Sequence, residues 1–192
     1  MDPKPLRIVD YDPRWRERFA EVGSALRAAL GARAVRIDHI GSTAVPGLAA
    51  KDVVDIQITV MDLAAADGWP DELIPGVVRR YRGIADDHVP PGLVADVGEW
   101  TKHYWASRRS VHVHVREAGR ANQRYALLFR DYLRADALAA ASYGLLKRAL
   151  AEWAPDDWET YFAVKDPACD LILAGAEQWA ARTQWTPGPS DV

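Results

Sequence analysis

A short loop of small and hydroxyl-bearing residues, Gly41, Ser42 and Thr43, precedes an acidic residue, Asp55, by just over a dozen positions. Glycine lets the backbone approach a ligand closely, and the amides and hydroxyls of such a loop can donate hydrogen bonds to phosphate oxygens. Carboxylate oxygens such as those of Asp55 are the ligands that a hard divalent cation prefers. The pattern is typical of a site for a metal-bound phosphate, although a Gly-Ser pair also occurs in ordinary turns.

Two histidines offer a second kind of chemistry. His112 and His114 alternate with valines, and because side chains alternate between the faces of a strand, both imidazoles lie on one side. Such a pair can position a phosphate or act as a base. It also suits zinc or another transition metal, with His39 or Asp55 completing the ligand set, and this alternative would make the protein a metal-dependent hydrolase. A half-exposed polar strand face is the third interpretation.

Two strands are expected to position these residues. Residues 34–40 alternate in polarity and lead into the loop 41–47, which predicts a strand followed by a tight turn. In residues 52–60 the apolar side chains share one face, and the polar side chains, among them Asp55 and Gln57, share the other. The loop and the Asp55 face therefore belong to consecutive strands.

Helical patterns flank these strands. Asp12 and Pro13 can open a helix, and Gly31 can end one. Between these two ends, apolar residues recur at three- and four-residue spacing. From Ala121 onward the spacing is again helical, and Pro167 is expected to open the last helix. The remaining patterns predict a short helix from Asp62, a strand over 77–82, a loop at 90–92, a hairpin of 100–106 and 111–115, and a helix over 138–153.

The order of these elements predicts a single domain over residues 1–185. Its mixed α/β core covers about 1–118, and a helical part covers about 119–185. Residues 186–192 are expected to form a flexible tail.

The composition excludes several classes of protein. Lys and Arg number 24 against 27 Asp and Glu, so the net charge of -3 gives no general attraction to duplex nucleic acid or to an anionic membrane. The single cysteine, Cys169, excludes an internal disulfide and is expected to be a buried, small hydrophobic residue. With neither a signal-peptide pattern nor about 20 consecutive apolar residues, a cytoplasmic location is expected. No heptad pattern indicates an oligomeric state.

The run HIGSTAVPGLAAK at 39–51, followed by VDIQ at 54–57, resembles the signature of the GrpB family, which is grouped with the nucleotidyltransferase superfamily. The resemblance continues through HVHV at 112–115 and through the helical half as far as Lys165, so it covers nearly the whole chain. It implies a nucleotidyltransferase-like α/β fold, in which a small mixed sheet is flanked by helices and followed by a C-terminal helical segment.

The resemblance also implies a function. The Gly-Ser loop would hold the phosphates of a nucleoside triphosphate (NTP), and Asp55 would bind Mg²⁺, with the two histidines facing it from the neighbouring strand. Lys51, Lys147 and Lys165 would lie nearest the phosphates. The implied reaction is transfer of a nucleotidyl group to an unknown small acceptor, with pyrophosphate as the leaving group. Trp100 and Trp105 are the candidates for stacking on the base.

One position departs from the superfamily pattern. Gln57 stands where a second carboxylate is expected, so it is a candidate catalytic residue together with Asp55, His112 and His114. Its oxygen carries no charge, which weakens a site for a hard cation. GrpB-like segments also occur attached to dephospho-CoA kinases, where an accessory folding role has been suggested. A non-catalytic module that binds a nucleotide or a CoA-related compound is therefore the main alternative.

Overall fold

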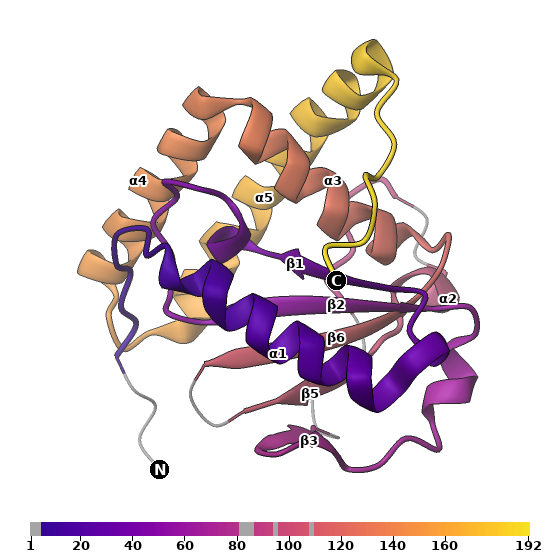
Figure 1. Ribbon diagram of the computed structural model, residues 1–192. Coiled ribbons are helices and arrows are strands. Elements are labelled where there is room, and N and C mark those ends of the chain that lie inside the picture. The colour runs from indigo at the N-terminus through magenta and orange to yellow at the C-terminus, as the bar shows by residue number, and fades with distance from the viewer. Residues whose placement is uncertain (1–4, 81–86, 94–95, 108–109) are drawn as a thin grey trace.

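The computed structural model describes residues 5–80, 87–93, 96–107 and 110–192 (Figure 1). The strands are β1 (Arg36–Ile40), β2 (Val54–Val60), β3 (Glu72–Ile74), β4 (Val77–Arg79), β5 (His103–Ala106) and β6 (Val111–Glu117). The helices are α1 (Arg14–Leu30), α2 (Val97–Trp100), α3 (Ala121–Ala135), α4 (Ala137–Trp153) and α5 (Trp158–Thr183), with short 3-10 turns η1 (Gly31–Arg33), η2 (Ser42–Ala44) and η3 (Leu63–Ala66).

The strands form one sheet in the order β1-β2-β6-β5-β4-β3. Strands β2 and β6 run parallel, and the other neighbouring pairs run antiparallel. The sheet is mixed, as the family resemblance implies, although no pattern had indicated the short strand β3. The expected strand 77–82 ends at Arg79 in β4, and residues 81–86 lie outside the described residues.

Helix α1 covers the apolar face of the sheet, and the C-terminal helices gather on the other side (Figure 1). Trp15, Phe19 and Leu26 of α1 are buried against the apolar side chains of β2 and β6. Fully burying one such side chain contributes about 1.5–3 kcal/mol, so this face holds the sheet in place. As predicted, the helix begins just after Asp12, whose Oδ1 accepts a hydrogen bond from the amide of Arg14.

The polar face of the sheet is set by the register of β2 against β6. Asp55 lies opposite His112, and Gln57 lies opposite His114. Because paired positions on neighbouring strands point to the same face, these four side chains share the side that α3 covers. The alternation in two separate parts of the sequence thus brings the predicted site residues to one face.

Two of the expected boundaries in the helical half and the tail are wrong. Pro167 does not open a helix, because it lies inside α5. This helix begins at Trp158, and the side chain of Asp157 caps it by accepting a hydrogen bond from the amide of Thr160. A proline inside a helix loses one backbone hydrogen bond. Here the helix continues through it because the residues beyond pack against α3, which a sequence pattern does not reveal.

Residues 186–192 are not a free tail. They return to the edge strand β1 (Figure 1), where the amide of Val192 donates to the carbonyl of Ile37 at 3.2 Å. Asp191 Oδ2 accepts hydrogen bonds from the amide of His39 and from Arg130 Nη1, both at 2.9 Å. The short segment has no periodicity, yet it supplies acceptors to the unpaired amides of an edge strand.

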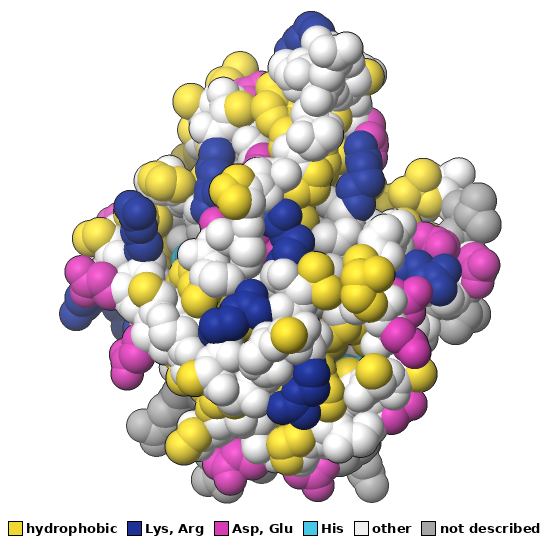
Figure 2. Space-filling model, turned by 45° about the vertical axis from the view of Figure 1, so that its right-hand side comes forward, with side chains coloured by type: hydrophobic (Ala, Val, Ile, Leu, Met, Phe, Trp, Pro, Cys, Tyr) yellow, Lys and Arg dark blue, Asp and Glu magenta, His cyan; other side chains and the backbone are white. Residues whose placement is uncertain are grey.

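The surface carries charges of both signs. On the face shown in Figure 2, basic and acidic side chains are interspersed with hydrophobic ones, in keeping with the small net charge. Within the ranges that the structure describes, no helix is both long and apolar enough to cross a membrane.

Candidate functional site

A cavity of about 460 Å³ opens between the polar face of the sheet and helices α3, α4 and α5. Its size is in the range of small-molecule sites, which are roughly 300–1,000 Å³. The predicted site residues that line it are Gly41, Ser42, Thr43, Lys51, Asp55, His112, His114, Lys147 and Lys165. Residues that are far apart in the sequence therefore meet around one space.

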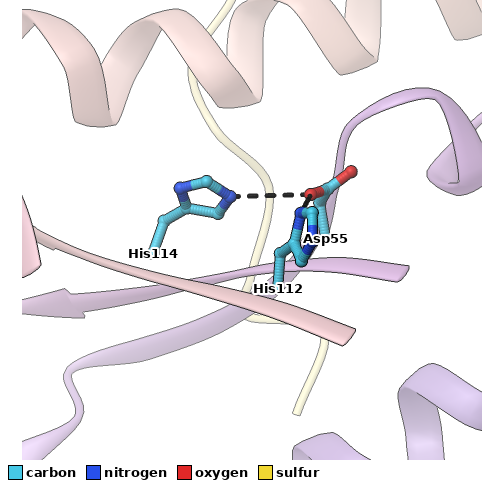
Figure 3. Close-up of side chains that lie close together, drawn as sticks. All are labelled: Asp55, His112 and His114. Atoms are coloured by element: carbon cyan, nitrogen blue, oxygen red, sulfur yellow. Dashed lines mark ion pairs between the residues drawn. The ribbon is translucent and has the colours of Figure 1, made fainter. Parts of the chain in front are cut away.

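In the lining of the cavity, the carboxylate of Asp55 contacts the imidazoles of His112 and His114 (Figure 3). Asp55 Oδ1 lies 3.2 Å from His112 Nδ1 and 3.5 Å from His114 Nε2. Burial opposes the negative charge, but the hydrogen bonds from the two histidines outweigh it and hold the pKa of Asp55 well below its usual range. Burial also lowers the pKa of His114 to about 4, so this imidazole is neutral near pH 7.

The Gly-Ser loop lies directly against this carboxylate. Gly41 adopts φ 70° and ψ -172°, a conformation that is essentially restricted to glycine. A Cβ added to Gly41 would lie 2.7 Å from Asp55 Oδ2. The backbone can therefore approach the carboxylate this closely only because residue 41 has no side chain.

Lys147 connects the loop to the helical half. Its Nζ donates hydrogen bonds to Ser42 Oγ at 2.8 Å and to the carbonyl oxygen of Ala49 at 2.5 Å. Burial lowers the pKa of Lys147 to about 7. A buried ammonium held by two neutral oxygens is a suitable partner for an anionic ligand.

The two other predicted lysines have different surroundings. Lys51 Nζ lies 5.0 Å from the ring centre of Trp158 and 5.4 Å from that of Tyr161, in the range of cation-π contacts. Burial lowers the pKa of Lys51. Lys165 Nζ forms an ion pair with Asp166 at 2.7 Å. Lys165 thus has a carboxylate partner, whereas Lys51 rests on aromatic rings.

Comparison with known proteins identifies the family. The family model described as GrpB protein matches residues 5–174. The chain belongs to the GrpB family. A UPF0157 protein of Streptomyces coelicolor is 42% identical to it over 90% of this chain and 84% of that protein.

A protein named dephospho-CoA kinase, from Mycolicibacterium paratuberculosis, is 39% identical over 95% of this chain and 49% of its own length. The chain thus spans about half the length of the kinase-named relatives it matches. A crystal structure described as conserved protein GrpB from Enterococcus faecalis superposes with a TM-score of 0.71 at 31% identity, covering 90% of this chain and 99% of that one. The predicted α/β fold, with a mixed sheet flanked by helices and a C-terminal helical segment, is confirmed, and it is consistent with the nucleotidyltransferase-like fold that the resemblance implies.

Gln57, predicted to be a catalytic residue, does not reach the cavity. Its side chain is fully buried, with Oε1 accepting from Arg116 Nη1 at 2.7 Å and Nε2 donating to the carbonyl of Gln123 at 3.1 Å. Arg116 Nε is in turn paired with Asp87 Oδ2 at 2.8 Å, and Lys102 pairs with the other oxygen of Asp87. The contacts of Gln57 therefore position Arg116 rather than a ligand.

Sequence reasoning missed this cluster of Arg116, Lys102 and Asp87, all of which line the cavity. Strand alternation would have found Arg116, because it follows His114 by two positions on the same face. Asp87 comes from an irregular segment, and no periodic signal marks it. Burial opposes its charge, but Arg116 and Lys102 hold the pKa of Asp87 well below its usual range.

Two other candidates point away from the site. His39 pairs in register with Ile56, so it faces the apolar side, where its ring stacks on Phe19. It cannot complete a metal site with His112 and His114. Trp105 is likewise fully buried on that side, with Nε1 donating to the carbonyl of Pro70 at 3.2 Å, so it cannot stack on a base in the cavity.

Trp100, the other candidate for base stacking, does line the cavity. Cys169 is buried, as expected, and lines the same wall, where its Sγ lies 3.4 Å from the hydroxyl of Tyr143. The C-terminal helices also bring five aromatic rings to the lining, those of Tyr125, Phe129, Tyr143, Tyr161 and Phe162.

Proposed function

We propose that this cavity binds the phosphates of an NTP and supports transfer of its nucleotidyl group to a small acceptor. The observation that carries the proposal is the contact of the Gly41 backbone with the Asp55 carboxylate inside a cavity lined by lysines. A phosphate chain that enters there meets loop amides, the Ser42 hydroxyl and buried ammonium groups together.

The charges favour an anionic ligand. Lys147 is held by two neutral oxygens, and Lys51 rests on aromatic rings, so both can offer their charge to a phosphate. Burial works against the ammonium form of each, and an anion would restore it. Binding of the phosphates and protonation of the lysines therefore support each other.

In the proposed reaction, the acceptor oxygen forms a bond to the α-phosphorus as the bond to the β-phosphate oxygen breaks. Pyrophosphate leaves with the bonding electrons, and the proton of the acceptor hydroxyl is released to water. The loop and the lysines hold the phosphates in place and balance the charge that develops on the leaving group.

The residues around Asp55 fit the two-Mg²⁺ arrangement of active nucleotidyltransferases poorly. Mg²⁺ prefers oxygen ligands, whereas the neighbours of Asp55 are the imidazoles of His112 and His114. The oxygen of Gln57 is taken by Arg116. We therefore assign no step of the reaction to a Mg²⁺ pair.

The test is calorimetric titration of each NTP into the protein with a divalent cation present, for the wild type and for Asp55→Asn. The variant keeps the shape but loses the negative charge that would hold the divalent cation against the phosphates, so we expect NTP affinity to fall at least about tenfold. Asp67→Asn is the matched control, since Asp67 is also paired with a histidine, His103, at 3.0 Å but lies outside the lining of the cavity. Absence of NTP binding to the wild type would contradict the proposal.

Turnover separates catalysis from binding alone. The protein is incubated with each NTP, a divalent cation and a pool of metabolites that includes dephospho-CoA, because several relatives are named dephospho-CoA kinase. Release of pyrophosphate that Asp55→Asn abolishes supports transfer. Binding of NTP without pyrophosphate instead supports the accessory module.

A further inference from the structure

We propose that Asp55, His112 and His114 form a site for one first-row transition-metal ion, such as Mn²⁺, Co²⁺ or Zn²⁺, in preference to Mg²⁺. The three residues each offer one ligand atom, and these atoms lie within 4.8 Å of one another. One carboxylate with two imidazoles is a donor set that transition metals favour, whereas Mg²⁺ is bound by oxygen.

The spacing of the donors suits a common ion. With metal–ligand distances of about 2.1 Å, neighbouring ligand atoms lie about 3.0 Å apart in an octahedron and about 3.4 Å apart in a tetrahedron. Asp55 Oδ1 lies 3.2 Å from His112 Nδ1 and 3.5 Å from His114 Nε2. The three ligand atoms lie within 4.8 Å of one another, so the two rings must turn toward each other for all three atoms to share one coordination shell.

The carboxylate is oriented for this role. Its Oδ2 is directed toward the Gly41 backbone, and its Oδ1 faces both imidazoles, which converge on it from β6 (Figure 3). The 3.5 Å between His114 Nε2 and Asp55 Oδ1 is at the limit for a hydrogen bond, so Asp55 holds His114 only weakly. The side chains of Asp55 and His112 are 28% and 36% exposed, which leaves the group open to an ion from the cavity.

Arg116 explains why one ion is expected and not two. It follows His114 on the same face of β6, and it donates to the oxygen of Gln57, the position where a second carboxylate would stand. A second cation would need negative ligands next to this guanidinium, but the nearby carboxylate, Asp87, is already paired with Arg116 and Lys102. A fixed cation of the protein therefore occupies the place of the second ion.

Metal binding at these three residues is independent of the proposed nucleotide chemistry, since the ion is measured without any nucleotide. The same ion would serve either nucleotidyl transfer or the metal-dependent hydrolysis considered from the sequence. Loss of NTP binding and loss of metal binding are separate results, so each proposal can fail alone.

The experiment uses tag-free protein stripped of metal with a chelator. Co²⁺ is titrated while the visible absorption is recorded, and Zn²⁺, Mn²⁺ and Mg²⁺ are titrated by calorimetry. We expect one ion per chain and an affinity for Co²⁺ at least about 100-fold higher than that for Mg²⁺. His112→Gln and His114→Gln should each lower Co²⁺ affinity by at least about tenfold and change the absorption bands.

His103→Gln is the matched control, because it removes a histidine that is also paired with an aspartate but does not line the cavity. Its Co²⁺ affinity should equal that of the wild type. Equal affinity for Mg²⁺ and Co²⁺, two ions per chain, or no Co²⁺ binding to the wild type would each overturn the proposal. These three results come from the unmodified chain, so they hold even if a variant folds poorly.

Discussion

Replacement of Gly41 by alanine tests the geometry on which the site depends. The added Cβ would lie 2.7 Å from Asp55 Oδ2, well below an ordinary contact, so the loop or the carboxylate must shift. The residue would also keep a backbone conformation, φ 70° and ψ -172°, that is strained for any side chain. We therefore expect both stability and ligand binding to suffer.

The backbone strain alone costs about 1–3 kcal/mol of unfolding free energy. In a chain of 192 residues, each kcal/mol lowers the melting temperature by about 2–4 °C, so we expect a loss of about 2–12 °C. The displaced carboxylate should weaken Co²⁺ or NTP binding in addition. Stability is measured by urea and thermal unfolding, and affinity by calorimetry.

Gly47→Ala is the control, because Gly47 also has a positive φ, 79°, but has no other atom within 4 Å of an added Cβ. It should be destabilised by backbone strain and keep its affinity. In an Asp55→Ala background the 2.7 Å contact with the carboxylate is gone and only the 3.2 Å approach to Cβ remains, so Gly41→Ala should then cost less than it does in the wild type. An equal cost in both backgrounds, or equal ligand affinity in Gly41→Ala and the wild type, would refute the reasoning.

Two further predictions concern buried charges. Burial lowers the pKa of Lys147 from 10.5 to about 7, so between pH 7 and pH 10.5 the unfolded chain binds more protons than the folded chain. The free energy of unfolding should therefore rise with pH in this range, by up to about 1.4 kcal/mol per pH unit. Urea unfolding at pH 7 and pH 9 should show this rise, and Lys147→Met should remove it; an unchanged slope in the variant would contradict the assignment. Asp191→Ala should lower the unfolding free energy by about 1–3 kcal/mol, because the amide of His39 and the guanidinium of Arg130 lose their acceptor. The same substitution at the exposed Asp10 should change stability by less than about 0.5 kcal/mol in the same urea titration.

The parts of the fold that the sequence predicts are those with a strong periodic signal. The helix from Arg14 and the alternating strands around Asp55 and His112 stand close to their expected positions, since burial on one face imposes a regular spacing. The convergence of Asp55 with the two histidines follows from that alternation together with the pairing of β2 with β6. The pairing itself was expected from the family resemblance, because local patterns do not specify which strands are neighbours.

The features that escaped prediction depend on contacts between distant segments. The tail at Asp191 looks unstructured in sequence, and its order comes from an edge strand more than 150 residues away. Pro167 looks like a helix start, because the packing that carries α5 through it is tertiary. Neither the spacing nor the residue types near these positions contain that information.

Gln57 shows how a motif can mislead about charge. The sequence alone, with Gln57 in place of a carboxylate, suggests a site that lacks one negative ligand and therefore cannot hold a second metal ion. In the structure the amide oxygen of Gln57 accepts from Arg116, and the negative charge that balances this guanidinium comes from Asp87. A carboxylate at position 57 would compete with Asp87 for the guanidinium of Arg116, and it would add a second negative charge in a buried place. The amide at position 57 therefore holds Arg116 by a neutral oxygen and leaves the two oxygens of Asp87 to Arg116 and Lys102.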